Sequence, residues 1–313
     1  MNSQALLYKL SRSYVFVLVI ALAIGIFFSE HTVFLAPYST WFLAGIFFLT
    51  ALKIDFKEFL RYCKGVKMIV VGNLLMLILF PIAVYYITDA IAPSLAIAFL
   101  ILAAMPSGMT VPLVAQICGG KQSLALVFAI STSLLAPFTV PLVIKLLIGG
   151  AISVSFLSMF LSLAKIIFIP FILANIIKYL WQKETEPAYK TFTPISILLL
   201  GLLIVGVSAK QADQIVLGQQ GDFIRYIIGL FILFIVFHIV GYFAIFWRSR
   251  EDRVTITVAL TYMNFTLAIY LVGEFFTEPN ILIPVVLSVI PWSILIVPFK
   301  LIVDRFGFVN HDK

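Results

Sequence analysis

The chain has 313 residues, of which 63% are hydrophobic and only 11% are charged. Its mean hydropathy is +1.15. Soluble domains carry about 25% charged residues, so this composition excludes a soluble protein and indicates an integral membrane protein. The formal net charge of +7 comes from basic residues beside the apolar runs, which is typical of membrane anchoring in a lipid bilayer and not of nucleic-acid binding.

Ten apolar runs follow one another along the chain, each near the length of about 20 residues that a transmembrane helix needs. Backbone groups left unpaired in lipid are costly, so we expect every run to be helical. The fold predicted for residues 1–313 is therefore a single all-α integral membrane domain. The expected spans are Tyr14–Phe28, Val33–Leu52, Lys67–Ile87, Ser94–Cys118, Gln122–Leu147, Ser153–Trp181, Thr191–Ala209, Phe223–Trp247, Val254–Phe276 and Ile281–Val303.

The basic residues also predict the orientation. With the N-terminus placed in the cytoplasm, most of the 21 Lys and Arg residues fall on the cytoplasmic side. The positive-inside rule then places both termini in the cytoplasm, for a multi-pass protein of the cell (plasma or inner) membrane. Cys63 and Cys118 fall on that same side, so we expect no structural disulfide.

The second half of the span pattern overlays the first at an offset of about 140–160 residues. This indicates a duplication, with one repeat over about 12–150 and another over about 151–305. Five spans per repeat would invert the second copy in the membrane. Inverted repeats are typical of secondary transporters that work by alternating access.

The fourth run contains two closely spaced prolines, Pro106 and Pro112. Proline removes a backbone donor and clashes with the preceding turn, so we expect an interrupted helix, although a simple kink is the alternative. An interruption would present unpaired N–H groups and the positive end of a half-helix to an anion. The residues between the prolines are predicted substrate contacts: Ser107, Gly108, Met109 and Thr110.

The ninth run concentrates polar residues at its centre. Asn264 is the strongest candidate there, because an amide inside a membrane is costly without partners. Thr261 and Thr266 flank it, but threonines often bond back to their own helix. In the tenth run, Ser293 is a further candidate for the cavity.

Two intramembrane groups are candidates for coupling. Lys165 lies about twelve residues into the sixth run, near mid-depth at about 1.5 Å per residue. It could counter an anionic substrate or replace a coupling cation, or it could snorkel to the interface. His238 in the eighth run could titrate in a proton-coupled cycle, or it could be a packed neutral residue.

The sequence lacks the motifs of a pump or protease. It has no Gly-x-x-x-x-Gly-Lys-Ser/Thr loop, no His-Glu-x-x-His and no Gly-x-Ser-x-Gly. We therefore expect no enzyme activity, no catalytic residues and no resident metal or cofactor.

Several segments resemble the bile acid:sodium symporter family, in order along the chain. They are the Leu-Lys-Ile-Asp-Phe run within Phe48–Phe56, Pro81, Pro106-Ser107-Gly108, Leu135-Ala136-Pro137 and Pro170. The resemblance implies a panel of spans one, two, six and seven and a core of the others. It also implies that broken fourth and ninth helices cross at the binding site. Asn264 then falls at the family's crossing-point asparagine, and Gly108–Thr110 falls where backbone amides meet an anionic substrate.

The resemblance does not extend to the family's sodium ligands. The corresponding positions here are Val111-Pro112, Ala125, Ala129, Ala259, Met263 and Met76. A hard cation needs several oxygen ligands, so we expect no sodium coupling, with Lys165 or a proton in its place.

The sequence thus predicts a secondary transporter of a small organic anion that does not use sodium. The alternatives are a sodium-coupled symporter of the same family, an auxin-efflux-like or metalloid-efflux carrier, and a non-transporting membrane receptor with this fold.

Overall fold

The computed structural model describes residues 16–17, 19–53, 66–150, 155–213, 223–276 and 278–306. Within these ranges the regular structure is helical, which confirms the all-α membrane class. Seven of the described helical stretches are long and apolar enough to cross a membrane: Ser29–Lys53, Lys67–Ile91, Gln122–Ile148, Phe156–Leu180, Thr191–Lys210, Phe223–Phe243 and Asn280–Arg305. The first expected span, Tyr14–Phe28, lies partly outside the described residues, as do Ile54, Asp55 and Phe56 of the family-like run and Cys63.

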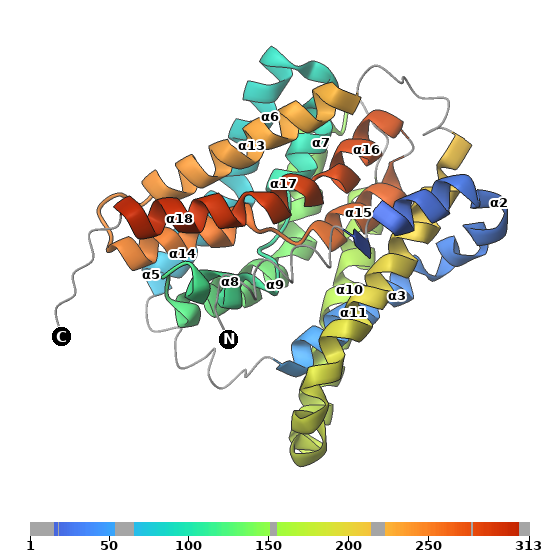
Figure 1. Ribbon diagram of the computed structural model, residues 1–313, viewed down its shortest axis with the longest axis horizontal. Helices are drawn as coiled ribbons and strands as arrows, with labels where there is room; N and C mark the ends of the chain where they lie inside the picture. The colour runs from blue at the N-terminus through green and yellow to red at the C-terminus, as the bar shows by residue number, and fades with distance from the viewer. Residues whose placement is uncertain are drawn as a thin grey trace.

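One group of helices extends along the right side of Figure 1 down to its lower edge, and we call it the panel. Its members are α2 (Ser29–Thr32), the 3₁₀ turn η1 (Val33–Tyr38), α3 (Ser39–Lys53), α10 (Phe156–Leu180) and α11 (Gln182–Lys210). Helix α3 packs against both α10 and α11. A Cβ on Gly206 would meet the backbone of Leu35 and Ala36 at about 3.0 Å, so glycine lets α11 approach η1 closely.

The remaining described helices form a second group, which we call the core (Figure 1). They are α5 (Val66–Leu74), the π-helical turn η2 (Leu75–Leu79), α6 (Phe80–Ile91), α7 (Pro93–Ala104), α8 (Val111–Ile117), α9 (Gln122–Ile148), α13 (Phe223–Phe243), α14 (Arg250–Thr261), α15 (Phe265–Phe275), α16 (Pro279–Leu287), α17 (Val289–Ile294) and α18 (Ile296–Phe306). Side chains of α9 are buried along most of its length, so it forms the centre of this group.

Prolines shape the core helices in two ways. Pro81 follows the π-helical turn η2, where a widened turn accommodates a residue that lacks a backbone donor. The expected tenth span is divided into α16, α17 and α18 at Ser288 and Leu295. Pro284 and Pro291 still contribute carbonyls that accept from the Ser288 and Leu295 N–H groups at 3.0 Å, so this stretch is kinked and not broken.

The panel and the core meet along limited surfaces. Helix α9 packs against α10, and α15 packs against α3 and α11. The Thr40 hydroxyl on α3 and the Tyr270 hydroxyl on α15 lie 3.2 Å apart. The candidate site lies at this boundary.

Candidate functional site

Two helix interruptions mark the site, one in each half of the chain. Helix α7 ends at Ala104 because Met105 is extended, with φ −70° and ψ 144°, and Pro106 follows it. Helix α8 begins at Val111, and Pro112 lies in its first turn, where the missing donor costs nothing.

The second interruption lies between α14, which ends at Thr261, and α15, which begins at Phe265. Asn264 precedes α15, and its Oδ1 accepts from the Leu267 N–H at 3.1 Å. The amide oxygen of Asn264 therefore caps the second half-helix.

The two interruptions cross and hydrogen-bond to each other. The Gly108 N–H donates to the Tyr262 carbonyl at 2.9 Å, and the Asn264 N–H donates to the Pro106 carbonyl at 2.8 Å. These bonds satisfy backbone groups that the interruptions release from their helices, as a membrane interior requires. A Cβ on Gly108 would lie 2.8 Å from the Tyr262 carbonyl oxygen, so this approach depends on glycine.

Ser107 stabilises the crossing from within. Its hydroxyl donates to the Ala259 carbonyl at 2.8 Å, and its N–H donates to the Thr132 hydroxyl at 3.1 Å. The residue is fully buried and forms an isolated antiparallel bridge with Met263. Ser107 therefore holds the two interruptions against α9 and does not line the cavity beside them.

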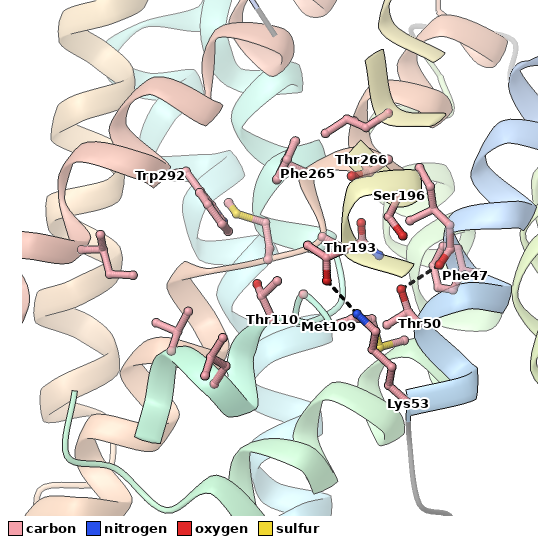
Figure 2. Close-up of a pocket in the computed structure, with 18 residues that line it drawn as sticks. Phe47, Thr50, Lys53, Met109, Thr110, Thr193, Ser196, Phe265, Thr266 and Trp292 are labelled. Atoms are coloured by element: carbon pink, nitrogen blue, oxygen red, sulfur yellow. Dashed lines mark hydrogen bonds between the residues drawn. The ribbon is translucent and has the colours of Figure 1, made fainter. Parts of the chain in front are cut away.

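A cavity of about 310 Å³ lies between the crossing and the panel, at the lower end of the size range of small-molecule sites. Figure 2 shows its walls. Its apolar lining residues include Phe47, Leu113, Leu200, Phe265, Trp292 and Ile296. Its polar side chains are Thr50, Lys53, Thr110, Thr193, Ser196, Asn264 and Thr266. The cavity thus offers an apolar surface with a few polar groups.

The structure brings five of the expected contact residues together: Gly108, Met109, Thr110, Asn264 and Thr266 all line the cavity. Thr261 and Ser293 do not line it. Both are buried, and within the described part of the chain their hydroxyls have no hydrogen-bond partner.

Of the N–H groups expected to be unpaired at the first interruption, that of Gly108 is paired, so this expectation was wrong for Gly108. The Gly108 N–H is bonded to Tyr262 because the interruptions cross so closely. Among the described residues, nothing accepts a hydrogen bond from the Met109 and Thr110 N–H groups. The Thr110 and Thr266 hydroxyls likewise have no partner there. These groups remain available to a ligand.

Lys53 was missed as a site residue. It is the last residue of α3, and its ammonium donates to the Thr193 hydroxyl of α11 at 2.8 Å, as Figure 2 shows. Among the described lining residues, Lys53 carries the only charged side chain. The signal in the sequence is the helical spacing of Ile46, Thr50 and Lys53, which places them on one face. Lys53 was instead interpreted as a basic residue at the end of a span and as part of the Leu-Lys-Ile-Asp-Phe run that resembles the family.

The two expected coupling residues lie outside the cavity lining. Lys165 is exposed on α10. The His238 Nδ1–H donates to the Phe234 carbonyl at 2.7 Å, and the His238 Nε2 lies 3.1 Å from the Tyr262 hydroxyl. Through Tyr262, His238 contacts the crossing from outside the cavity lining.

The positions aligned with the family's sodium ligands carry no side-chain oxygen. Ala259 and Met263 are buried at the crossing, where both contact Ser107, and Ala125 and Ala129 are buried on α9 and Met76 on η2. Their side chains can offer a hard cation no ligand.

An ion-pair cluster lies at the start of α14, ahead of the expected span. The Asp252 carboxylate is buried and lies 2.8 Å from the Lys121 ammonium and 2.9 Å from the Arg248 guanidinium. Burial alone would raise the pKa of Asp252, but hydrogen bonds and charge from Lys121 and Arg248 outweigh it and hold the pKa below its ordinary value. The cluster ties the α8–α9 connection to α14.

Comparison with known proteins identifies one family. The sodium bile acid symporter family matches residues 40–217, which is more than half of the chain. This stretch includes α3, the first interruption and α11. The search of curated proteins found no match.

Proposed function

The chain belongs to the sodium bile acid symporter family and is a multi-pass membrane transporter; we propose that it carries a small organic anion by alternating access, without sodium coupling. In this proposal it is a transporter and not an enzyme. It has ten spans in two inverted repeats, over about 12–150 and 151–305, in a cell membrane with both termini cytoplasmic.

The observation that carries the proposal is the crossing of two interrupted helices beside a cavity. Helices α7–α8 and α14–α15 come from different halves of the chain, and the cavity lies between their crossing and the panel. Substrate sites of inverted-repeat transporters lie at such interruptions, and movement of one group of helices against the other opens the site to either side.

The polar groups of the cavity favour an anion. Thr110, Thr266 and Met109, whose hydroxyl or N–H donors have no described partner, belong to the lining, and the described lining contains a lysine but no carboxylate. A negatively charged solute would therefore find donors and no repulsion.

Independence from sodium is supported by the side chains around the crossing. Ala259 and Met263 lie at the crossing, and Ala125 and Ala129 are buried on α9; their side chains offer hydrocarbon and a thioether, whereas a hard cation binds through several oxygen atoms.

Uptake of a panel of radiolabelled carboxylates into proteoliposomes tests the proposal. Imposed sodium, imposed proton and no gradient are compared at matched ionic strength. Uptake that persists without sodium supports the proposal. Strict sodium dependence would indicate a sodium-coupled symporter, and saturable binding without flux would indicate a receptor.

A further inference from the structure

We infer, building on the proposed function, that Lys53 recognises the anionic group of the substrate and that Thr193 holds the Lys53 ammonium until the anion binds. Lys53 reaches from the end of α3 to Thr193 on α11, over 2.8 Å. In Figure 2 the ammonium points toward Thr193, and Thr50, Met109 and Thr110 line the same cavity.

The Lys53 ammonium is available to a ligand. Lys53 is exposed at the cavity wall, and within the described part of the chain it forms no ion pair. Its partner there is a neutral hydroxyl, whereas a carboxylate would add the Coulomb attraction between two opposite charges to the hydrogen bond. A carboxylate that enters the cavity can therefore replace Thr193 or share the ammonium with it.

Two neighbouring hydroxyls on the panel can accept a hydrogen bond from the lysine but have no free hydrogen to donate to an anion. The Thr50 hydroxyl donates to the Ile46 carbonyl at 2.7 Å, and the Ser196 hydroxyl donates to the Phe192 carbonyl at 2.8 Å. Because their hydrogens are committed, these oxygens face the cavity as acceptors. Lys53 is thus the charged donor on the panel side, beside the Thr193 hydroxyl that accepts from it.

The opposite wall belongs to the core, where Thr110 and the Met109 N–H are donors without described partners. A carboxylate has two oxygens, so it can accept from Lys53 on the panel and from Thr110 on the core at once. Substrate binding would then connect the two groups of helices that must move against each other.

A single positive charge in the cavity also predicts selectivity between monoanions and dianions. A monocarboxylate finds its counter-charge at Lys53, whereas the second carboxylate of a dianion would lie among apolar residues without one. Such an unpaired charge is costly to desolvate. The site should therefore prefer monoanions to dianions of equal length.

The test uses three probes of equal chain length with the purified full chain in detergent. Octanoate is a monoanion, octanamide is its neutral counterpart, and suberate is the dianion. Dissociation constants come from ligand-induced thermal stabilisation. Wild-type protein should bind octanoate at least about tenfold more tightly than either other probe, as expected for one charge-assisted hydrogen bond.

Three variants separate recognition from a structural role. Lys53→Met should weaken octanoate binding about tenfold and leave octanamide binding unchanged, while Lys53→Arg should keep most of the affinity. Thr193→Val is the matched control. It removes the same hydrogen bond but frees the ammonium, so octanoate binding should stay equal or tighten.

The inference is overturned if Thr193→Val loses as much octanoate affinity as Lys53→Met, because the pair would then be only a link between α3 and α11. Equal binding of octanoate and octanamide by the wild type, or binding of neither, overturns it too. Intact octanoate binding without flux in proteoliposomes would refute the proposed transport and leave the role of Lys53 standing.

Discussion

Gly108→Ala tests whether the crossing depends on close backbone approach. An added Cβ would lie 2.8 Å from the Tyr262 carbonyl oxygen and 3.2 Å from that of Met263. Both obstacles are backbone atoms, which cannot rotate away as a flexible side chain would. The two interruptions must therefore separate, and the 2.9 Å bond from Gly108 to Tyr262 must lengthen or break.

The cost follows from two terms. Forcing extra volume into a packed site costs about 1–3 kcal/mol, and leaving a buried donor or acceptor unpaired costs about 1–3 kcal/mol. Since separation relieves part of the clash while it breaks the bond, the terms are not fully additive. We expect a loss of about 2–4 kcal/mol in the free energy of unfolding, together with a marked fall in uptake.

Thermal unfolding of the purified variant in detergent measures this loss, and proteoliposome uptake measures the functional effect. Gly150→Ala is the matched control, because a Cβ there meets nothing within 4 Å and should change stability by no more than about 0.5 kcal/mol. If Gly108→Ala unfolds at the same temperature as Gly150→Ala, the crossing does not depend on glycine and the reasoning is refuted.

Three further predictions concern the site and its surroundings. Asn264→Ala removes a helix cap worth about 1 kcal/mol and a cavity-lining amide, so uptake should fall at least about tenfold while size-exclusion profiles stay monodisperse; unchanged uptake kinetics would exclude Asn264 from the site. Asp252→Asn should lower thermal stability at neutral pH, because the carboxylate loses its charge toward Lys121 and Arg248. Since the pKa of Asp252 is lower in the folded state, the stability that its carboxylate contributes is present above pH 3.8 and is lost as the pH falls below that value. The difference in melting temperature between wild type and Asp252→Asn should therefore disappear at such low pH. A difference that persists would contradict the ion pairing of Asp252. Lys165→Met should leave uptake unchanged because Lys165 is exposed outside the cavity lining, and a clear loss of uptake would instead support a coupling role.

Much of the fold could be predicted because long apolar runs in a bilayer have few structural options. The interruption after Ala104 could be anticipated from Pro106 alone, since proline acts on its own helix. The bonds between the two interruptions could not, because Gly108 and Tyr262 are far apart in sequence and their pairing is decided by tertiary packing.

The positions of the two lysines show a second limit. Helix α10 is apolar around most of its circumference, so periodicity gave no preferred face for Lys165. Lys53 belongs to the Leu-Lys-Ile-Asp-Phe run, which indicated the family and not a binding residue. Its contact with Thr193 became visible only once α3 and α11 were packed together, because each helix supplies half of it.

The paired backbone bonds at the crossing impose a constraint on length. The Gly108 and Asn264 donors and the Tyr262 and Pro106 acceptors align in a single antiparallel register, and a shift by one residue in either segment would misplace both bonds. Insertions or deletions within one interruption should therefore survive only with a compensating change in the other. Through these two bonds, the two interruptions are expected to change in length together.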